Sequence, residues 1–275
     1  MASAEGKSAA GKMEDSSSST VENLKNEIGV RIDFIKKKLQ SNDFENAEEA
    51  IKEIALIKIG GPKWDCSQTI QDLLQISSVF LKRCSYMLSL CLVMSSTELS
   101  DLLPDNEERM EKLGSCSAAA MDVSTTMVAN REKNAIEKQA LPILKEVCRR
   151  LQALKENIDI EHKAYLLSYC YHRIATSCYY IGEFKEALEY GEAGISVLSK
   201  TFGEDAKKYI PTAACYYLNG RVYHYMGKYD QAVECFKKTI EVYEVDDSFG
   251  EEEKAQNIRL VQEKLLRAEA SLPPA

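Results

Sequence analysis

A segment of this chain recurs after 45 residues, and this internal repeat constrains the fold more than any other feature of the sequence. The two copies contain YYIGEFKEALEY and HYMGKYDQAVEC. Gly182 and Ala187 of the first copy align with Gly227 and Ala232 of the second, and an aromatic residue follows each glycine by two positions. Glycine ends a helix, the aromatic ring packs at the start of the next, and alanine lets the two helices approach closely. The repeat therefore predicts two helical hairpins within residues 165–245.

The second copy resembles the tetratricopeptide repeat family, whose motif is about 34 residues long. It has aromatic, small and alanine residues where that family has them. The matching positions are Tyr216, Gly220, Tyr223, Ala232 and Phe236. The resemblance implies antiparallel helical hairpins that stack into a right-handed superhelix.

The first copy, which starts at Ser168, fits the same motif less closely. Cys178 stands where the family has its second aromatic residue, while Gly191 and Gly194 stand where it has larger residues. Because these glycines carry no side chain to fill the space between helices, we expect the second helix of this copy to pack loosely.

The repeat period is about eleven residues longer than the family motif, and the extra residues include a turn at Gly203. Long repeats with a turn of this kind resemble those of kinesin light chains, and the resemblance covers about residues 165–270. A last helix, 252–270, carries an apolar stripe and is interpreted as the C-terminal cap. The stripe consists of Ile258, Val261, Leu265 and Ala268.

The chain divides into three parts by composition and pattern. Residues 1–20 are rich in Ser, Ala, Gly and Lys, so we expect a disordered tail. Residues 21–160 form a more irregular N-terminal helical region, and residues 161–270 contain the repeats and their cap. Residues 21–58 are either a degenerate repeat or an ordinary amphipathic hairpin.

Apolar spacing in the N-terminal region predicts helices throughout, with no strand pattern. We expect one helix over 67–95, buried in its second half, a short helix over 106–113, and a long helix over 131–156 that bends near Pro142. The predicted fold class is all-α.

Composition and charge narrow the function. A net charge of -8 disfavours binding to nucleic acid or to an anionic membrane surface. No apolar run is long enough to span a bilayer or to act as a secretory signal, so membrane insertion is not expected. The nine cysteines occur without CxxC pairs and are typical of reduced core side chains. These features predict a cytoplasmic protein.

Nothing in the sequence indicates catalysis. The chain contains no GxxxxGK[ST], GxSxG or HExxH motif, and its three histidines lack the spacing of metal ligands. We therefore expect no catalytic residue, no metal and no cofactor.

Thirteen of the fourteen tyrosines lie between Tyr165 and Tyr243. Tyrosine combines a wide apolar face with one polar atom, which suits peptide recognition, although some of these rings match structural positions of the family. In the family, ligands lie in the concave groove of the first helices of each hairpin. The resemblance places these residues there: Tyr169, His172, Arg173, Thr176, Tyr179, Tyr180, Tyr217, Arg221, His224 and Tyr225.

Two hypotheses follow for function. The first is an adaptor or scaffold that binds a partner protein or peptide in this groove. Thr176 and Arg221 stand where chaperone-tail binders have asparagine, so a chaperone tail is not the expected ligand. The alternative is self-association through the N-terminal helices or the ends of the superhelix.

Overall fold

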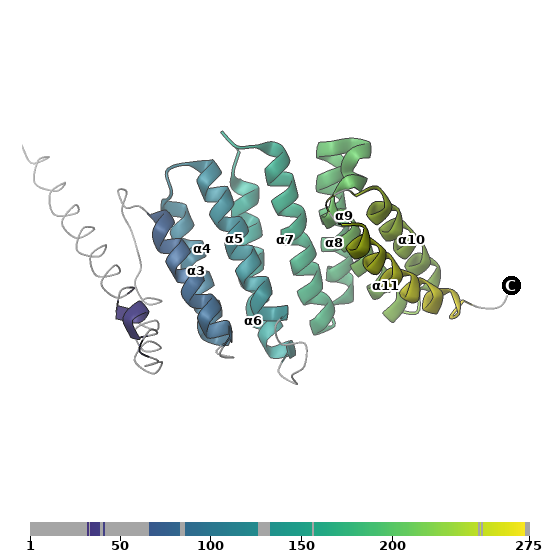
Figure 1. The fold of residues 1–275 in the computed structure, drawn as a ribbon, viewed down its shortest axis with the longest axis horizontal. Coiled ribbons are helices and arrows are strands. Elements are labelled where there is room, and N and C mark those ends of the chain that lie inside the picture. The colour runs from purple at the N-terminus through teal and green to yellow at the C-terminus, as the bar shows by residue number, and fades with distance from the viewer. Residues whose placement is uncertain are drawn as a thin grey trace, which may run out of the picture. The chain divides into compact units, whose positions relative to one another are not determined.

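The computed structural model describes most of the chain from residue 66 onward, and its regular elements are all helices (Figure 1). No strand occurs in the described part, so the all-α prediction is confirmed. The tail, the loop around Trp64 and nearly all of the hairpin at 21–58 lie outside it. The described residues are 32, 34–38, 41, 66–82, 86–125, 133–155, 157–246, 248 and 250–272.

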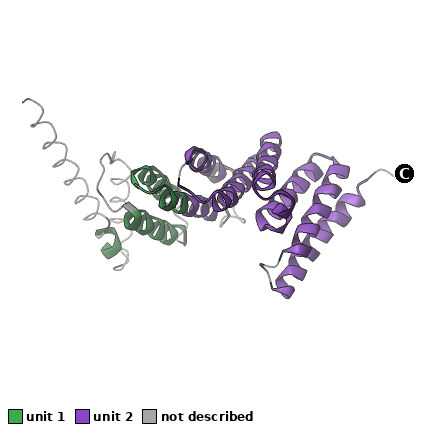
Figure 2. Cartoon of the chain, turned by 90° about the horizontal axis from the view of Figure 1, so that it is seen from above, with its two compact units in different colours: residues 1–112 green, residues 113–275 purple. Residues whose placement is uncertain are grey.

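The chain divides into two compact units, Met1–Lys112 and Leu113–Ala275 (Figure 2). The boundary that we expect near residue 160 stays a prediction. Helix α6, which precedes the repeats, packs against the first repeat helix and lies in the second unit with it.

In the first unit, the expected single helix over 67–95 is wrong. The structure has two helices, α3 (Cys66–Lys82) and α4 (Tyr86–Leu99), packed against each other. Buried serines join them: the hydroxyl oxygens of Ser77 and Ser89 are 2.6 Å apart, and each hydroxyl also donates to the other residue's carbonyl. The sequence between the helices has no glycine or proline, so it carries no signal that one helix ends and another begins.

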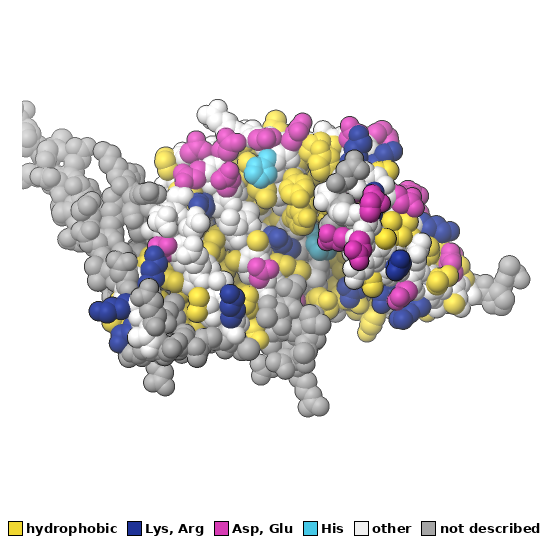
Figure 3. All heavy atoms as spheres, in the orientation of Figure 1, with side chains coloured by type: hydrophobic (Ala, Val, Ile, Leu, Met, Phe, Trp, Pro, Cys, Tyr) yellow, Lys and Arg dark blue, Asp and Glu magenta, His cyan; other side chains and the backbone are white. Residues whose placement is uncertain are grey.

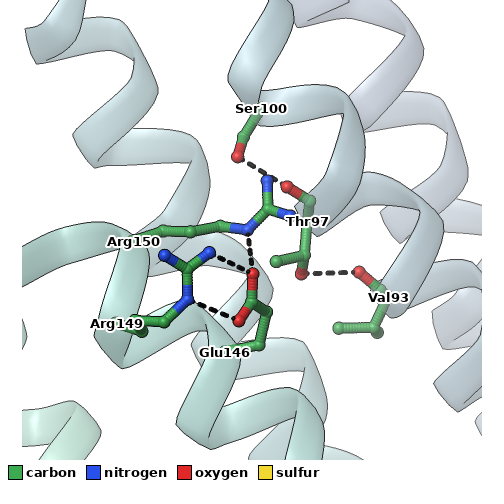
Figure 4. A network of polar contacts seen from close by, with 6 residues as sticks. All are labelled: Val93, Thr97, Ser100, Glu146, Arg149 and Arg150. Carbon is green, nitrogen blue, oxygen red and sulfur yellow. Dashed lines mark hydrogen bonds and ion pairs between the residues drawn. The ribbon is translucent and has the colours of Figure 1, made fainter. Parts of the chain in front are cut away.

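Helix α4 is buried along most of its length, as expected, but not all round. Met87 and Met94 are 52% and 43% exposed. At its end, the Thr97 hydroxyl donates to the Val93 carbonyl and the Ser100 hydroxyl to the Thr97 carbonyl (Figure 4). These bonds lead into a short 3-10 helix, η1 (Ser100–Leu102).

Helix α5 (Asn106–Thr125) continues well beyond the expected end at residue 113. The Asp105 carboxylate caps it by accepting from the amides of Glu107 and Glu108 at 2.8 and 2.9 Å. The Ser- and Ala-rich second half is weakly apolar, yet Cys116 and Ala120 are fully buried there. A buried stripe continues along the helix at three- and four-residue spacing, from Met110 and Leu113 through these small residues to Val123.

In the second unit, paired helices lie side by side along the chain (Figure 1). The two predicted hairpins are α7–α8 and α9–α10, with a 3-10 helix between them and α11 after them. Gly182 and Gly227 have φ of 90° and 73° after the first helix of each hairpin, a conformation that favours glycine. The elements are α6 (Lys133–Ala153), α7 (Ile160–Ile181), α8 (Phe184–Phe202), η2 (Gly203–Lys208), α9 (Ile210–Tyr225), α10 (Tyr229–Val245) and α11 (Glu251–Glu269).

Helix α6 lies in the second unit, and its surface carries a small ionic cluster (Figure 4). The Glu146 carboxylate accepts hydrogen bonds from Arg149 and Arg150. The bond from Arg149, followed by that from Arg150, lowers the pKa of Glu146 to about 2 although partial burial opposes it. Pro142 lies inside α6, and a bend there stays a prediction.

The expected loose packing of the second helix in the first hairpin is wrong. Gly191 and Gly194 of α8 are both buried. A Cβ atom added at Gly194 would lie 2.7 Å from the Cys215 sulfur, and the Gly194 carbonyl accepts from the Ser168 hydroxyl at 2.9 Å. The glycines therefore allow closer contact between α7, α8 and α9 than a larger residue would.

Helix α11 packs on α10 as a cap, as expected. Its Val261 and Ala268 share a buried cluster with Ala232 and Phe236. Within the described residues no helix has both the length and the apolar character needed to cross a bilayer. Five of the cysteines described there as free thiols are buried: Cys116, Cys148, Cys170, Cys178 and Cys215.

Replacing Gly194 by alanine tests the close contact. We expect Gly194→Ala to lower the free energy of unfolding by about 1–3 kcal/mol, because the new methyl group overlaps the Cys215 sulfur. Removing that sulfur should relieve the overlap, so Gly194→Ala with Cys215→Ala should be less destabilised than the sum of the single changes. Denaturant unfolding measures both. Helix propensity alone predicts stabilisation by Gly194→Ala, and that result would contradict the close contact.

Candidate peptide-binding groove

The first helices of the two hairpins, α7 and α9, pack against each other and carry all ten residues expected in the groove. On the face shown in Figure 3, apolar side chains gather beside these helices, with basic and histidine side chains among them. The ten residues do not behave alike, because some contact one another and others are held by neighbouring helices.

Arg221 of α9 lies among tyrosine rings. Its guanidinium carbon is 4.6 Å from the ring centre of Tyr179, 5.8 Å from that of Tyr217 and 5.9 Å from that of Tyr180. Burial lowers the pKa of Arg221, but interactions with Tyr179 and Tyr180 outweigh it and raise the pKa above its usual value. The rings thus hold a permanent positive charge on the surface that α7 and α9 share.

Aromatic contacts continue from this arginine toward the turn between α7 and α8. Tyr179 contacts Tyr180 and Phe184, with ring centres 5.3 and 6.0 Å apart. Phe184 in turn lies 4.6 Å from the ring of Tyr225, which is 67% exposed. An exposed ring with a fixed neighbour offers contact area at little entropic cost.

Arg173 is held inside the protein rather than offered to a ligand. Its Nη1 donates to the Ser117 hydroxyl at 2.8 Å, and its guanidinium lies 5.5 Å from the Tyr169 ring centre. Thr176 is buried and its hydroxyl donates to the His172 carbonyl at 2.8 Å. Arg173 thus connects α7 to α5, and Thr176 forms a hydrogen bond within α7. The contacts of both side chains are structural.

His172 remains neutral over a wide pH range. Burial lowers its pKa to about 4, and the positive charges of Arg173 and Arg221 add to the effect. Its Nε2 lies 3.5 Å from the Thr176 hydroxyl oxygen. A neutral imidazole adds no charge to this part of the groove.

A pocket of about 200 Å³ opens at the end of this surface. It brings together four of the expected residues, Tyr179, Arg221, His224 and Tyr225. The other six line α7 and α9 outside it.

Sequence reasoning missed three residues of this pocket. They are Phe236 of α10 and Lys264 and Arg267 of α11. The two cations are three positions apart on one helix face, and that spacing was the available signal. The apolar stripe of α11 predicts only a cap.

The described residues contain no group of three His, Cys, Asp or Glu side chains placed to hold a metal ion. The His224 ring contacts the Tyr229 ring, with centres 5.4 Å apart, at the turn that ends α9. His224 therefore contributes to an aromatic contact beside the pocket.

Comparison with known proteins supports the repeat assignment. Residues 170–244 match the model of the tetratricopeptide repeat family. This segment is a tetratricopeptide repeat region. Repeats of this family serve as scaffolds for protein–protein interaction. No curated protein matches the chain.

Solved structures are similar to this chain. BtubC (BKLC) from P. vanneervenii is 9% identical with a TM-score of 0.50, and the match covers 92% of this chain and 88% of that one. A Podosopora anserina protein described as a kinesin light chain with nearly identical TPR-like repeats is 14% identical with a TM-score of 0.46, over 76% of this chain and 97% of that one. At these identities the likeness concerns the fold alone.

Titration of His172 tests the electrostatics of the groove. We expect its ring signals to stay unchanged between pH 8 and pH 5, because its pKa is about 4. Arg221→Gln removes a nearby positive charge and should raise that pKa toward the usual value of about 6.5. NMR titration, with His172→Asn to assign the signals, measures both. A wild-type midpoint near 6.5 would contradict the described burial.

Proposed function

We propose that this protein is a non-enzymatic adaptor that binds a peptide segment of a partner protein along α7 and α9. The observation that carries the proposal is Arg221, a cation supported by the rings of Tyr179, Tyr180 and Tyr217. Aromatic and arginine side chains dominate the energy of many protein interfaces, and here they lie together. The repeat region supports the proposal because its family provides scaffolds of this kind.

In this proposal only some of the ten expected residues contact the peptide. Tyr179, Tyr180, Tyr217, Arg221 and Tyr225 form the contact surface in this proposal. Thr176 and Arg173 stabilise α7 instead. The net charge of -8 favours a protein partner over nucleic acid, and nine cysteines without CxxC pairs favour a cytoplasmic location.

A paired substitution tests the groove. Tyr180→Ala with Arg221→Glu removes one ring and reverses the charge, and we expect it to abolish most partner capture in affinity purification followed by mass spectrometry. Lys200→Glu, on an exposed position of α8, is the matched charge-reversal control and should retain the partners. Circular dichroism verifies that each variant is folded. Unchanged capture by a folded Tyr180→Ala, Arg221→Glu protein would rule out the groove.

Exposed apolar side chains favour self-association as a second candidate function. Met87 and Met94 on α4 are 52% and 43% exposed, and Leu260 and Leu266 on α11 are 51% and 65% exposed. Isolated exposed apolar residues are common on monomers, so this candidate ranks second.

Light scattering over a concentration series separates the two candidates. Self-association predicts a mass that rises with concentration, and Met87→Glu with Met94→Glu should prevent the rise if α4 forms the contact. A monomer at every concentration would exclude self-association as the function.

A further inference from the structure

The pocket at the end of the groove is lined by four helices of the repeat region, with Phe236 contributed by α10. Tyr179 comes from α7, Arg221 and Tyr225 from α9, and Lys264 and Arg267 from α11. Helix α11 therefore does more than cover the end of the last hairpin. Its cations complete a pocket that the groove helices begin.

The lining of this pocket is strongly basic. It contains Arg221, Lys264 and Arg267, and no aspartate or glutamate. In the described part of the chain, no carboxylate forms an ion pair with Lys264 or Arg267. A local excess of positive charge in a chain with a net charge of -8 selects an anionic ligand.

The same pocket has an aromatic interior. Phe236, which is 1% exposed, contributes its fixed ring, and Tyr179 and Tyr225 add theirs. A cavity of about 150 Å³ accommodates benzene in another protein, so about 200 Å³ leaves room for a substituted benzene ring. Apolar walls beside cations suit a ligand that combines a ring with a negative group.

We propose that this pocket binds the phosphotyrosine side chain of a partner peptide. A phosphate monoester carries nearly two negative charges and three acceptor oxygens, which match the three cationic side chains better than the single charge of a carboxylate. Its phenyl ring contacts the rings of Tyr179 and Tyr225, since the nearly buried Phe236 offers little surface to a ligand. The inference rests on the proposed function in one respect: the peptide that carries this side chain continues along α7 and α9.

Small probes test the pocket directly on the full chain. Phenyl phosphate carries both the ring and the dianion, inorganic phosphate carries only the dianion, and benzoate pairs the ring with a single charge. We expect phenyl phosphate to bind most tightly in calorimetric or NMR titrations. Lys264→Gln with Arg267→Gln should weaken its binding at least about tenfold, because two charge-assisted hydrogen bonds are lost.

A control on the same helix removes the same charge elsewhere. Lys254→Gln with Arg259→Gln changes two α11 cations that do not line the pocket, so phenyl phosphate should bind as in the wild type. Equal weakening by both pairs would overturn the proposal, since only general charge would then matter. Absence of phenyl phosphate binding, or equal affinity for inorganic phosphate or benzoate, would also overturn it.

Partner capture distinguishes failure of this inference from failure of the adaptor function. If Tyr180→Ala with Arg221→Glu loses its partners while Lys264→Gln with Arg267→Gln keeps all of them, the groove stands and the phosphotyrosine pocket fails. If phenyl phosphate binding depends on Lys264 and Arg267 but Tyr180→Ala with Tyr217→Ala, which changes only groove residues outside the pocket, keeps its partners, the pocket stands and the groove fails.

Discussion

Helix contacts too close to admit a Cβ atom hold the repeat region together. At Gly194 the Cys215 sulfur lies within 2.7 Å of the position a Cβ would occupy, and at Gly220 the Phe236 ring does. These contacts set the separation of α8 from α9 and of α9 from α10. Because α9 is fixed by both, Arg221 is held within reach of the tyrosines of α7. The surface proposed to bind a peptide therefore depends on the close contacts that α9 makes with α8 and α10.

The repeat is where the sequence predicted the structure best. Gly182 and Gly227 mark the turns because their backbone conformation excludes most other residues, and such a requirement is visible in a single sequence. The all-α class and the capping helix followed from apolar spacing, which reports the buried face of a helix. The close packing at Gly191 and Gly194 could not be predicted from the sequence. A glycine in a helix is compatible either with a gap beside it or with close contact to a neighbouring helix.

Other features were hidden because they depend on residues far apart in sequence. The contact between α3 and α4 includes Ser77 and Ser89, whose mutual hydrogen bonds have no local sequence pattern. Arg173 matched a groove position, but its partner Ser117 lies on α5, outside the repeat motif. Register along a repeat predicts which face a residue occupies. It does not predict whether a side chain on that face already forms a hydrogen bond with a neighbouring helix.

Helix α11 shows how stability and recognition share one element. Val261 must pack on Phe236 to cover the last hairpin, and this fixes the rotation of the helix. Positions 264 and 267 lie three and six residues further on, which places Lys264 beside the buried stripe and the exposed Arg267 further round the helix. Long basic side chains there keep their charges at the edge of the buried cluster while their stems cover apolar surface. The packing that caps the repeat region thus also carries two cations to the end of the groove.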